Sequence, residues 1–419
     1  MNKKLYLILF SISALFLAAL LSRSRDIALL TIPFLVYLGA GAITVPRDVH
    51  LNVTRELSIL RTVEDVPVTV TLTVENSGGR IPRLQIMEPV FEKMNLVEGN
   101  LTPSYTIVSD ERIKVVYTFT AARGIYNWQT VKMKASDPFG LFEQTVEMGA
   151  PGHVHVFPKQ IDLRNFSFRP VPNVRTTGPN PSRLPGSGVD FWGVREYHPG
   201  DALRTIYWRK SAQHPGTLIT KEFEREEIAD VGILLDARSS ANDTANGEDL
   251  FENSIRAAAS LASHFISKGN RVSMLILNDR LVRIFPGYGK HQLLRILEEL
   301  SCCTPGERVS FDTLKYLPVR LFPNHSLITI ISPLLPNDFP FLARLKAEGY
   351  QLLVASPERP KPVVKNNAYA VYAQRIAAVE RAGLLRQIQR IQVPVVKWDA
   401  SQPDEMARQF SRFVKVRTR

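Results

Sequence analysis

The sequence predicts a chain of three successive parts: a helical hairpin that crosses a membrane, an antiparallel β-sandwich, and a doubly wound α/β domain. Three observations lead to this prediction. Two long uncharged apolar runs open the chain, a period-two alternation of apolar and polar residues follows, and buried strands then alternate with amphipathic helices. The expected boundaries are 1–48 for the hairpin, 49–160 for the sandwich, 161–227 for a connector with a motif-rich segment, and 228–419 for the α/β domain.

The predicted hairpin comprises residues 5–21 and 27–45, neither of which contains a charged side chain. A helix that crosses a bilayer needs about 20 predominantly apolar residues, so each run is long enough. Because only residues 22–26 separate the runs, both ends of the hairpin are expected on one side of the membrane. A cleaved signal peptide is the alternative for the first run, since Lys3 and Lys4 precede it.

Strand patterns follow the hairpin. Residues 66–74 (VPVTVTLTV) and 113–120 (IKVVYTFT) alternate β-branched and other residues with a period of two, and turn residues separate such runs. This spacing predicts a β-sandwich of about 100 residues. Residues 137–142 (DPFGLF) are expected to form a tight turn that closes the end of the sandwich with two phenylalanines. Residues 168–188 contain five prolines and three glycines and are expected to be a connector without regular structure.

The formal net charge of +12 is unevenly distributed, since residues 342–419 contain 15 Lys or Arg and 6 Asp or Glu. In a chain anchored at a bilayer, this excess favours attraction to anionic lipid headgroups. It is not accompanied by a recognisable nucleic-acid-binding module, so a nucleic-acid partner is not expected. Cys302 and Cys303 are adjacent and predict free thiols. Lys and Arg are divided almost evenly across the hairpin, so they do not by themselves set its orientation. The free thiols and the basic charge favour a cytoplasmic body, on a protein that crosses the inner membrane more than once.

Residues 188–224 interleave aromatic and charged side chains, which fits neither the period of a strand nor that of a helix. One interpretation is an internal brace, in which aromatic residues fill the junction between the sandwich and the α/β domain. The other is a protein-docking surface, because Trp, Tyr and Arg dominate interface hot spots. Both interpretations single out Trp192, Arg195, Glu196, Tyr197, Asp201, Arg204 and Trp208.

The same segment also contains residue types that occur in catalytic sites. His198, Ser211 and His214 could be assembled into a hydrolase triad with Asp201. The sequence contains no nucleophile elbow, phosphate-binding loop or His-x-x-x-His pair to support that assembly, so neither catalysis nor a small-molecule substrate is expected. The simpler expectation is that Asp201 caps the start of a helix and that Ser211 is exposed.

Residues 188–224 closely resemble the signature of the bacterial domain of unknown function 58 family, and residues 123–126 and 137–142 resemble segments upstream of it. Strand 231–235, followed by Asp236 and a long helix, looks like the start of a von Willebrand factor A domain. The resemblance implies a membrane hairpin, a β-sandwich and a von Willebrand-like domain. It also implies a MoxR-type AAA+ ATPase as a partner, because such genes are often neighbours.

Domains of the von Willebrand type often bind a divalent cation through an Asp-x-Ser-x-Ser motif, with later loops completing the site. Here Asp236 and Ser240 are in place, but Arg238 occupies the middle serine position, and its guanidinium would repel a cation and could pair with Asp236. The later loop has Ser332-Pro333 where an aspartate is usual, and Ser310 or Thr313 could supply the threonine ligand. We therefore expect no tight Mg²⁺ site and no other cofactor.

The leading hypothesis is a membrane-anchored, non-enzymatic adaptor or assembly factor that docks protein partners. The rival hypotheses are a metal-dependent ligand-binding module and a scaffold that binds anionic lipids.

Overall fold

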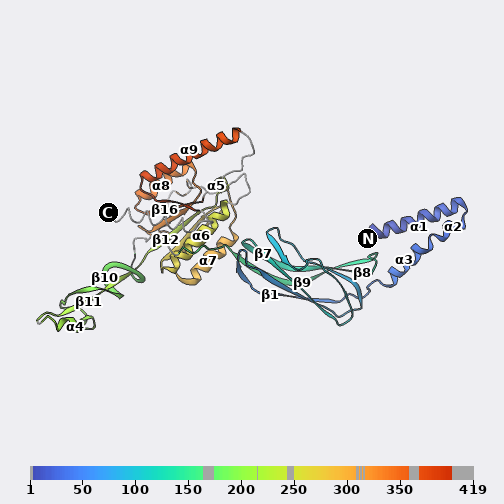
Figure 1. The fold of residues 1–419 in the computed structure, drawn as a ribbon, viewed down its shortest axis with the longest axis horizontal. Coiled ribbons are helices and arrows are strands. Elements are labelled where there is room, and N and C mark those ends of the chain that lie inside the picture. The colour runs from blue at the N-terminus through green and yellow to red at the C-terminus, as the bar shows by residue number, and fades with distance from the viewer. Residues whose placement is uncertain are drawn as a thin grey trace. The chain divides into compact units, whose positions relative to one another are not determined.

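The computed structural model describes residues 3–163, 174–214, 216–242, 250–307, 311, 314, 317–357 and 368–398. The chain divides into two compact units, Met1–Phe157 and Pro158–Arg419. The first contains apolar helices and two β-sheets, and the second contains a six-stranded sheet and a two-stranded ribbon (Figure 1).

The apolar N-terminal runs form helices α1 (Lys3–Ser22), α2 (Arg25–Leu29) and α3 (Ile32–Ile43). The spans Lys4–Ser22 and Arg25–Ile43 are each long and apolar enough to cross a membrane. The second span is divided after Leu29, whereas a single helix was expected. Pro33 explains the break, since a proline has no N–H to donate and its ring clashes with the carbonyl four residues earlier.

The sandwich consists of two sheets. The first has the order β1-β3-β7-β5 and the second the order β2-β9-β8-β4-β6; all neighbours are antiparallel except β2 and β9. The strands of the first sheet are β1 (Leu51–Leu57), β3 (Val68–Asn76), β7 (Arg112–Ala121) and β5 (Met94–Glu98). Those of the second are β2 (Arg61–Val63), β9 (Glu143–Phe157), β8 (Gly124–Ser136), β4 (Ile81–Met87) and β6 (Ser104–Ile107).

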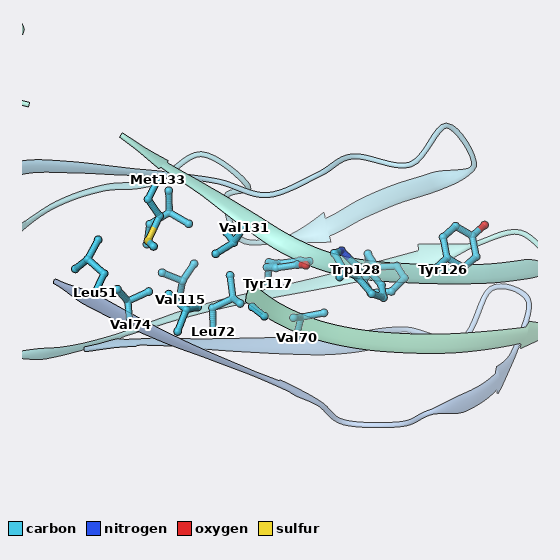
Figure 2. Close-up of a cluster of buried hydrophobic side chains, with 14 of the residues drawn as sticks. Leu51, Val70, Leu72, Val74, Val115, Tyr117, Tyr126, Trp128, Val131 and Met133 are labelled. Carbon is cyan, nitrogen blue, oxygen red and sulfur yellow. The ribbon is translucent and has the colours of Figure 1, made fainter. Parts of the chain in front are cut away.

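The core of the sandwich lies between the two sheets, and its apolar side chains alternate along each strand (Figure 2). Val70, Leu72 and Val74 of β3 point inward, as the period of two in the sequence predicts. Beside this apolar core, the buried guanidinium of Arg55 donates two hydrogen bonds to Glu88, at 2.8 and 3.0 Å. The ion pair is almost completely shielded from water, with both side chains at most 1% exposed.

The ribbon consists of β10 (Val174–Glu196) and β11 (Ile219–Ile228), which pair antiparallel. The expectation of a connector without regular structure over 168–188 is therefore wrong from Val174 onward. The error has a physical reason. In a two-stranded ribbon both strands are edges, where a missing proline N–H is tolerated, and the register shifts near Pro181 and Pro185 are the irregularities that accommodate prolines.

The second unit is built on a sheet of order β14-β13-β12-β15-β16-β17, in which only β14 runs antiparallel to its neighbour. Every residue of β12 is buried, as expected for a central strand. The strands are β12 (Asp230–Asp236), β13 (Arg271–Leu277), β14 (Leu281–Gly287), β15 (Leu327–Ile331), β16 (Gln351–Pro357) and β17 (Val395–Trp398). Strand β14 was not predicted from the sequence.

Helices cover the sheet, with α6 and α7 on one side and α8 and α9 on the other (Figure 1). They are α5 (Ser239–Asn242), α6 (Leu250–Ser267), α7 (Gly289–Cys302), α8 (Phe339–Ala347) and α9 (Ala368–Arg390). Residues 399–419, at the end of the predicted α/β domain, lie outside the described residues. Because β13 and β15 flank β12 on opposite sides, the chain reverses its direction of winding at β12, and loops from β12 and β15 meet at the carboxyl edge of the sheet.

Candidate functional site

The first candidate site lies at that carboxyl edge, where Asp236 ends β12. Its carboxylate is fully buried and is paired with Arg238, two residues later. The Nε of Arg238 donates to Oδ1 of Asp236, and its Nη2 donates to Oδ2, both at 2.8 Å. The pairing that the sequence suggested between these two residues is present in the structure.

A second carboxylate, which the sequence analysis did not identify, completes the cluster. Asp338 comes from the short 3-10 helix Pro336–Asp338, a hundred positions along the chain, and accepts a 2.8 Å hydrogen bond from Nη2 of Arg238. The ring of Phe311 lies 4.4 Å from the guanidinium carbon. No local pattern marks Asp338, because only the folded chain brings it to β12.

Burial and charge act in opposite directions on this cluster. Burial disfavours the charged guanidinium, but hydrogen bonds and charges from Asp236 and Asp338 outweigh it, so the pKa of Arg238 lies above its ordinary value. Burial raises the pKa of Asp338, and the contact with Arg238 offsets part of that effect. The cluster is therefore a buried salt bridge in which one guanidinium joins two acids.

Among the described residues of the predicted cation site, Ser332 contacts Asp236 and Ser240 is turned to solvent. Ser240 is exposed on α5, while the hydroxyl of Ser332 donates to Oδ2 of Asp236 at 2.6 Å. Asn242 instead donates to the backbone carbonyls of Asp236 and Arg238, each at 2.9 Å. Ser310 and Thr313 lie outside the described residues. Since both oxygens of Asp236 accept hydrogen bonds from protein groups, this arrangement does not fit a hard divalent cation, which needs free oxygen ligands.

The second candidate site is the tip of the ribbon, residues 191–222, which we call the arm. Arg195 on β10 donates to both oxygens of Asp201 at 2.7 Å and to Glu222 on β11 at 3.0 Å. It also donates to the carbonyl of Glu196 at 2.9 Å. These bonds tie β10, β11 and the turn between them together, so the arm has its own polar framework.

Asp201 is the acceptor at the centre of this framework. Besides Arg195, the backbone N–H of His198 donates to it at 2.9 Å. Hydrogen bonds from Arg195 and then from His198 lower the pKa of Asp201 to about 2. The expectation that Asp201 caps a helix is therefore wrong, because its carboxylate is used across the turn and the 3-10 turn Leu203–Thr205 follows Ala202.

Ser211 also differs from expectation. It is buried at the end of α4 (Trp208–Ser211), and its Oγ accepts a 2.8 Å hydrogen bond from the N–H of Ile219 and donates to the carbonyl of Tyr207 at 3.1 Å. Backbone groups therefore use the hydroxyl that a hydrolase would need as a nucleophile. The Nδ1 of His198 lies 3.0 Å from the carbonyl of Glu196 and so braces the turn.

The arm exposes large apolar side chains around its framework. Trp208 is 64% exposed and Leu203 69% exposed, and Trp192 is 40% exposed. Arg204 and Glu196 are exposed as well, while Tyr197 is half-buried and donates its backbone N–H to the carbonyl of Leu218. Of the seven residues that the sequence singled out, Arg195 and Asp201 thus hold the arm, and Trp192, Arg204 and Trp208 form its surface.

The fold and the two sites describe a protein with an apolar N-terminal hairpin, a β-sandwich, and an α/β unit that bears an exposed arm. The model of the family "Protein of unknown function DUF58" matches residues 193–359, a segment that includes the Asp236 site and all of the arm except residues 191 and 192. This match confirms the family resemblance found in the sequence, over about two fifths of the chain. It is also 28% identical over 167 residues to the uncharacterized protein YeaD of Bacillus subtilis strain 168. That alignment covers 39% of this chain and 38% of YeaD, so it spans well under half of either protein.

Among solved structures, proximal thread matrix protein 1 from the mussel byssus is 15% identical, with a TM-score of 0.30 over 45% of this chain and 48% of that one. The CARDB domain of the Pyrococcus furiosus protein PF1109 is 13% identical, with a TM-score of 0.18 over 26% of this chain and 94% of that one. Neither similarity is close enough to support an argument about function.

Proposed function

We propose that this protein is a membrane-anchored, non-enzymatic adaptor that binds a protein partner through the exposed face of its arm. One observation carries the proposal: Trp208 and Leu203 are more than 60% exposed on a segment that its own ion pairs hold in place. Tryptophan is among the residue types that contribute most to protein interfaces. A surface that is ordered before it binds loses less conformational entropy on binding, which favours affinity.

The partner that we propose is a MoxR-type AAA+ ATPase, on the basis of the family resemblance. The charges of the arm support a protein partner, because Arg195 is neutralised internally by Asp201 and Glu222. Apolar contact around Trp208 would then supply most of the binding energy, with Arg204 at the rim. In this proposal the ATPase supplies the energy for remodelling other proteins, and this chain holds the ATPase at the membrane.

The membrane location rests on the two apolar spans, Lys4–Ser22 and Arg25–Ile43. We propose that both cross the bilayer, which makes the chain a multi-pass protein of the inner membrane. Both ends of such a hairpin lie on one side, and we propose that the folded units face the cytoplasm.

We further propose that the sheet of the second unit is a von Willebrand factor A-like domain that works without a cation. Two features support this assignment. The sheet is parallel except for its edge strand β14, and an aspartate ends the central strand β12. The ion pair between Arg238 and Asp236 favours docking without a cation over metal-dependent ligand binding. The rival lipid scaffold predicts instead that the body without its hairpin binds anionic vesicles in a salt-sensitive way.

Site-specific photo-crosslinking tests the adaptor proposal. A photoreactive phenylalanine analogue at position 208 is expected to crosslink the MoxR-type ATPase in native membranes. The same analogue at Tyr288, which is 72% exposed and aromatic but lies at the turn before α7, is the matched control and should not. Equal crosslinking from both positions, or none from 208 in a verified membrane preparation that contains the ATPase, would overturn the proposal.

A stability measurement separates docking from an internal brace. Because Trp208 is exposed, Trp208→Ala is expected to change the free energy of unfolding by no more than about 0.5 kcal/mol, while it abolishes recovery of the ATPase in a pull-down from native membranes. Arg195→Ala is less informative, since it removes the framework of the arm as well as any contact. A loss of about 3 kcal/mol or more in Trp208→Ala would support the brace.

A further inference from the structure

The loop between β8 and β9, residues 137–142, packs on helix α3 and not into the end of the sandwich. The rings of Phe139 and Tyr37 lie 4.7 Å apart between centroids. Gly41, one helical turn beyond Tyr37 on the same face, is in close contact with the loop, since a Cβ there would lie 3.0 Å from Leu141 Cδ1. The expectation that Phe139 plugs the sandwich is therefore wrong, as its side chain is 36% exposed and its ring packs against Tyr37 of the helix at an interplanar angle of 53°.

The loop satisfies its backbone N–H groups internally. The carboxylate of Asp137, fully buried, accepts from the N–H groups of Phe139, Leu141 and Phe142 at 2.7–3.0 Å. The N–H of Gly140 donates to the carbonyl of Asp137, and the N–H of Asp137 donates to the carbonyl of Phe142. The remaining residue, Pro138, has no N–H to satisfy. Satisfied N–H groups lower the cost of placing a non-helical loop at the edge of a lipid bilayer, where the carbonyl groups can still reach water.

The contact lies within the apolar span and not beyond its end. Tyr37 is six residues before the last residue of α3, Ile43, which corresponds to roughly 9 Å along the helix axis. A loop that contacts Tyr37 therefore reaches past the end of the span. Charged pairs begin directly behind the loop: Lys134 contacts Glu143 at 2.6 Å, and Lys132 contacts Glu147 at 3.0 Å. The loop thus has an apolar tip, Pro138 and Phe139, on a charged base.

We propose that residues 137–142 are inserted in the lipid interface beside α3, so that Pro138 and Phe139 contact lipid and the charged base lies among the headgroups. The sandwich is then seated on the bilayer and held at a fixed place on the hairpin. This inference rests on the membrane anchoring in the proposed function. The occupant of the apolar tip is lipid, because the tip continues the surface of a helix whose own apolar side chains are exposed over the same span.

Depth-dependent fluorescence quenching tests the proposal in the full chain. In a background with Cys302→Ser and Cys303→Ala, single cysteines at Val36, Phe139 or Ile125 are labelled with an environment-sensitive dye and reconstituted in phosphatidylcholine vesicles. Ile125 is the matched control, since it is an exposed apolar residue near the start of β8, the strand that leads into the loop. It lies about 36 Å from Ser136 at the other end of β8, at roughly 3.3 Å per residue.

The label at 139 is expected to show a blue-shifted emission and to lose fluorescence in vesicles that contain spin-labelled lipid, as the label at 36 does. The label at 125 should show neither change. If 36 is quenched and 139 behaves like 125, the interfacial loop is refuted and the anchor stands. If 36 itself is not quenched, the membrane anchor fails and the loop proposal fails with it. A cysteine at the neighbouring exposed Pro138 repeats the test with the Phe139–Tyr37 contact intact.

Discussion

Replacing Arg238 by alanine removes the only cation from the described cluster at the carboxyl edge of the sheet and leaves Asp236 and Asp338 buried together. The guanidinium supplies three hydrogen bonds of 2.8 Å to these two acids, and its side chain is 9% exposed. Removing one partner from a buried ion pair typically costs about 3–5 kcal/mol, because the remaining charge is left without compensation. We expect Arg238→Ala to destabilise the α/β unit by an amount in that range.

Hydrogen exchange is the appropriate assay, because a chain with several units need not unfold in one step. Peptides that contain β12 and β15 report the opening free energy of this sheet alone. At 1.4 kcal/mol for each factor of ten, the loss corresponds to exchange that is faster by roughly two to three and a half orders of magnitude. Arg112→Ala is the control: Arg112 also pairs with a glutamate, at 2.8 Å, but is 68% exposed, so its removal should cost about 1 kcal/mol or less.

Arg238→Ser sharpens the test, since it restores the Asp-x-Ser-x-Ser pattern from Asp236 to Ser240. The variant should be destabilised like Arg238→Ala in the absence of metal and should regain stability with Mg²⁺, by about 2.7 kcal/mol at a hundredfold excess over the dissociation constant. Arg238→Ala without the added hydroxyl should recover less. Wild-type exchange rates in Arg238→Ala would show that the guanidinium does not compensate the two acids, and the reasoning would be refuted.

Three further predictions concern other charged groups. Arg55→Met is expected to lower the unfolding free energy of the sandwich by about 3–5 kcal/mol, because it leaves the buried carboxylate of Glu88 without its partner. The double variant Arg55→Met, Glu88→Leu is expected to recover most of that loss, and equal losses for the two variants in denaturant unfolding would contradict this. Burial, and then the charge of Lys268, lowers the pKa of His264 to about 4 against the opposing effect of Asp162. Stability should therefore fall as the pH decreases from about 6.5 to about 4, where only the unfolded state takes up the proton, and His264→Gln should remove that part of the pH dependence in thermal unfolding. The pKa of Asp201 near 2 predicts that the arm keeps its Arg195 pair above the ordinary pKa of an aspartate and loses it only as the pH falls toward 2, which carboxyl carbon resonances would follow.

Much of the fold could be predicted because the signals are local. The period of two over residues 66–74 became β3, and the apolar run before Asp236 became β12, since burial of alternate or of all side chains follows directly from the strand's place in a sheet. The proline-rich segment could not be predicted in the same way. Its pairing with β11 depends on a partner strand more than twenty residues away, which no local pattern describes.

The candidate sites divide in the same manner. The sequence alone determined the apolar spans, the residue types of the arm and the Arg238–Asp236 neighbours, because each is a matter of composition or of positions two residues apart. Only the tertiary structure decided that Asp338 joins that pair, that Arg195 serves the framework while Trp208 faces outward, and that Phe139 packs against Tyr37. The physical reason is that charge compensation and burial are properties of distances in space, and the partners involved lie from six to about a hundred positions apart along the chain.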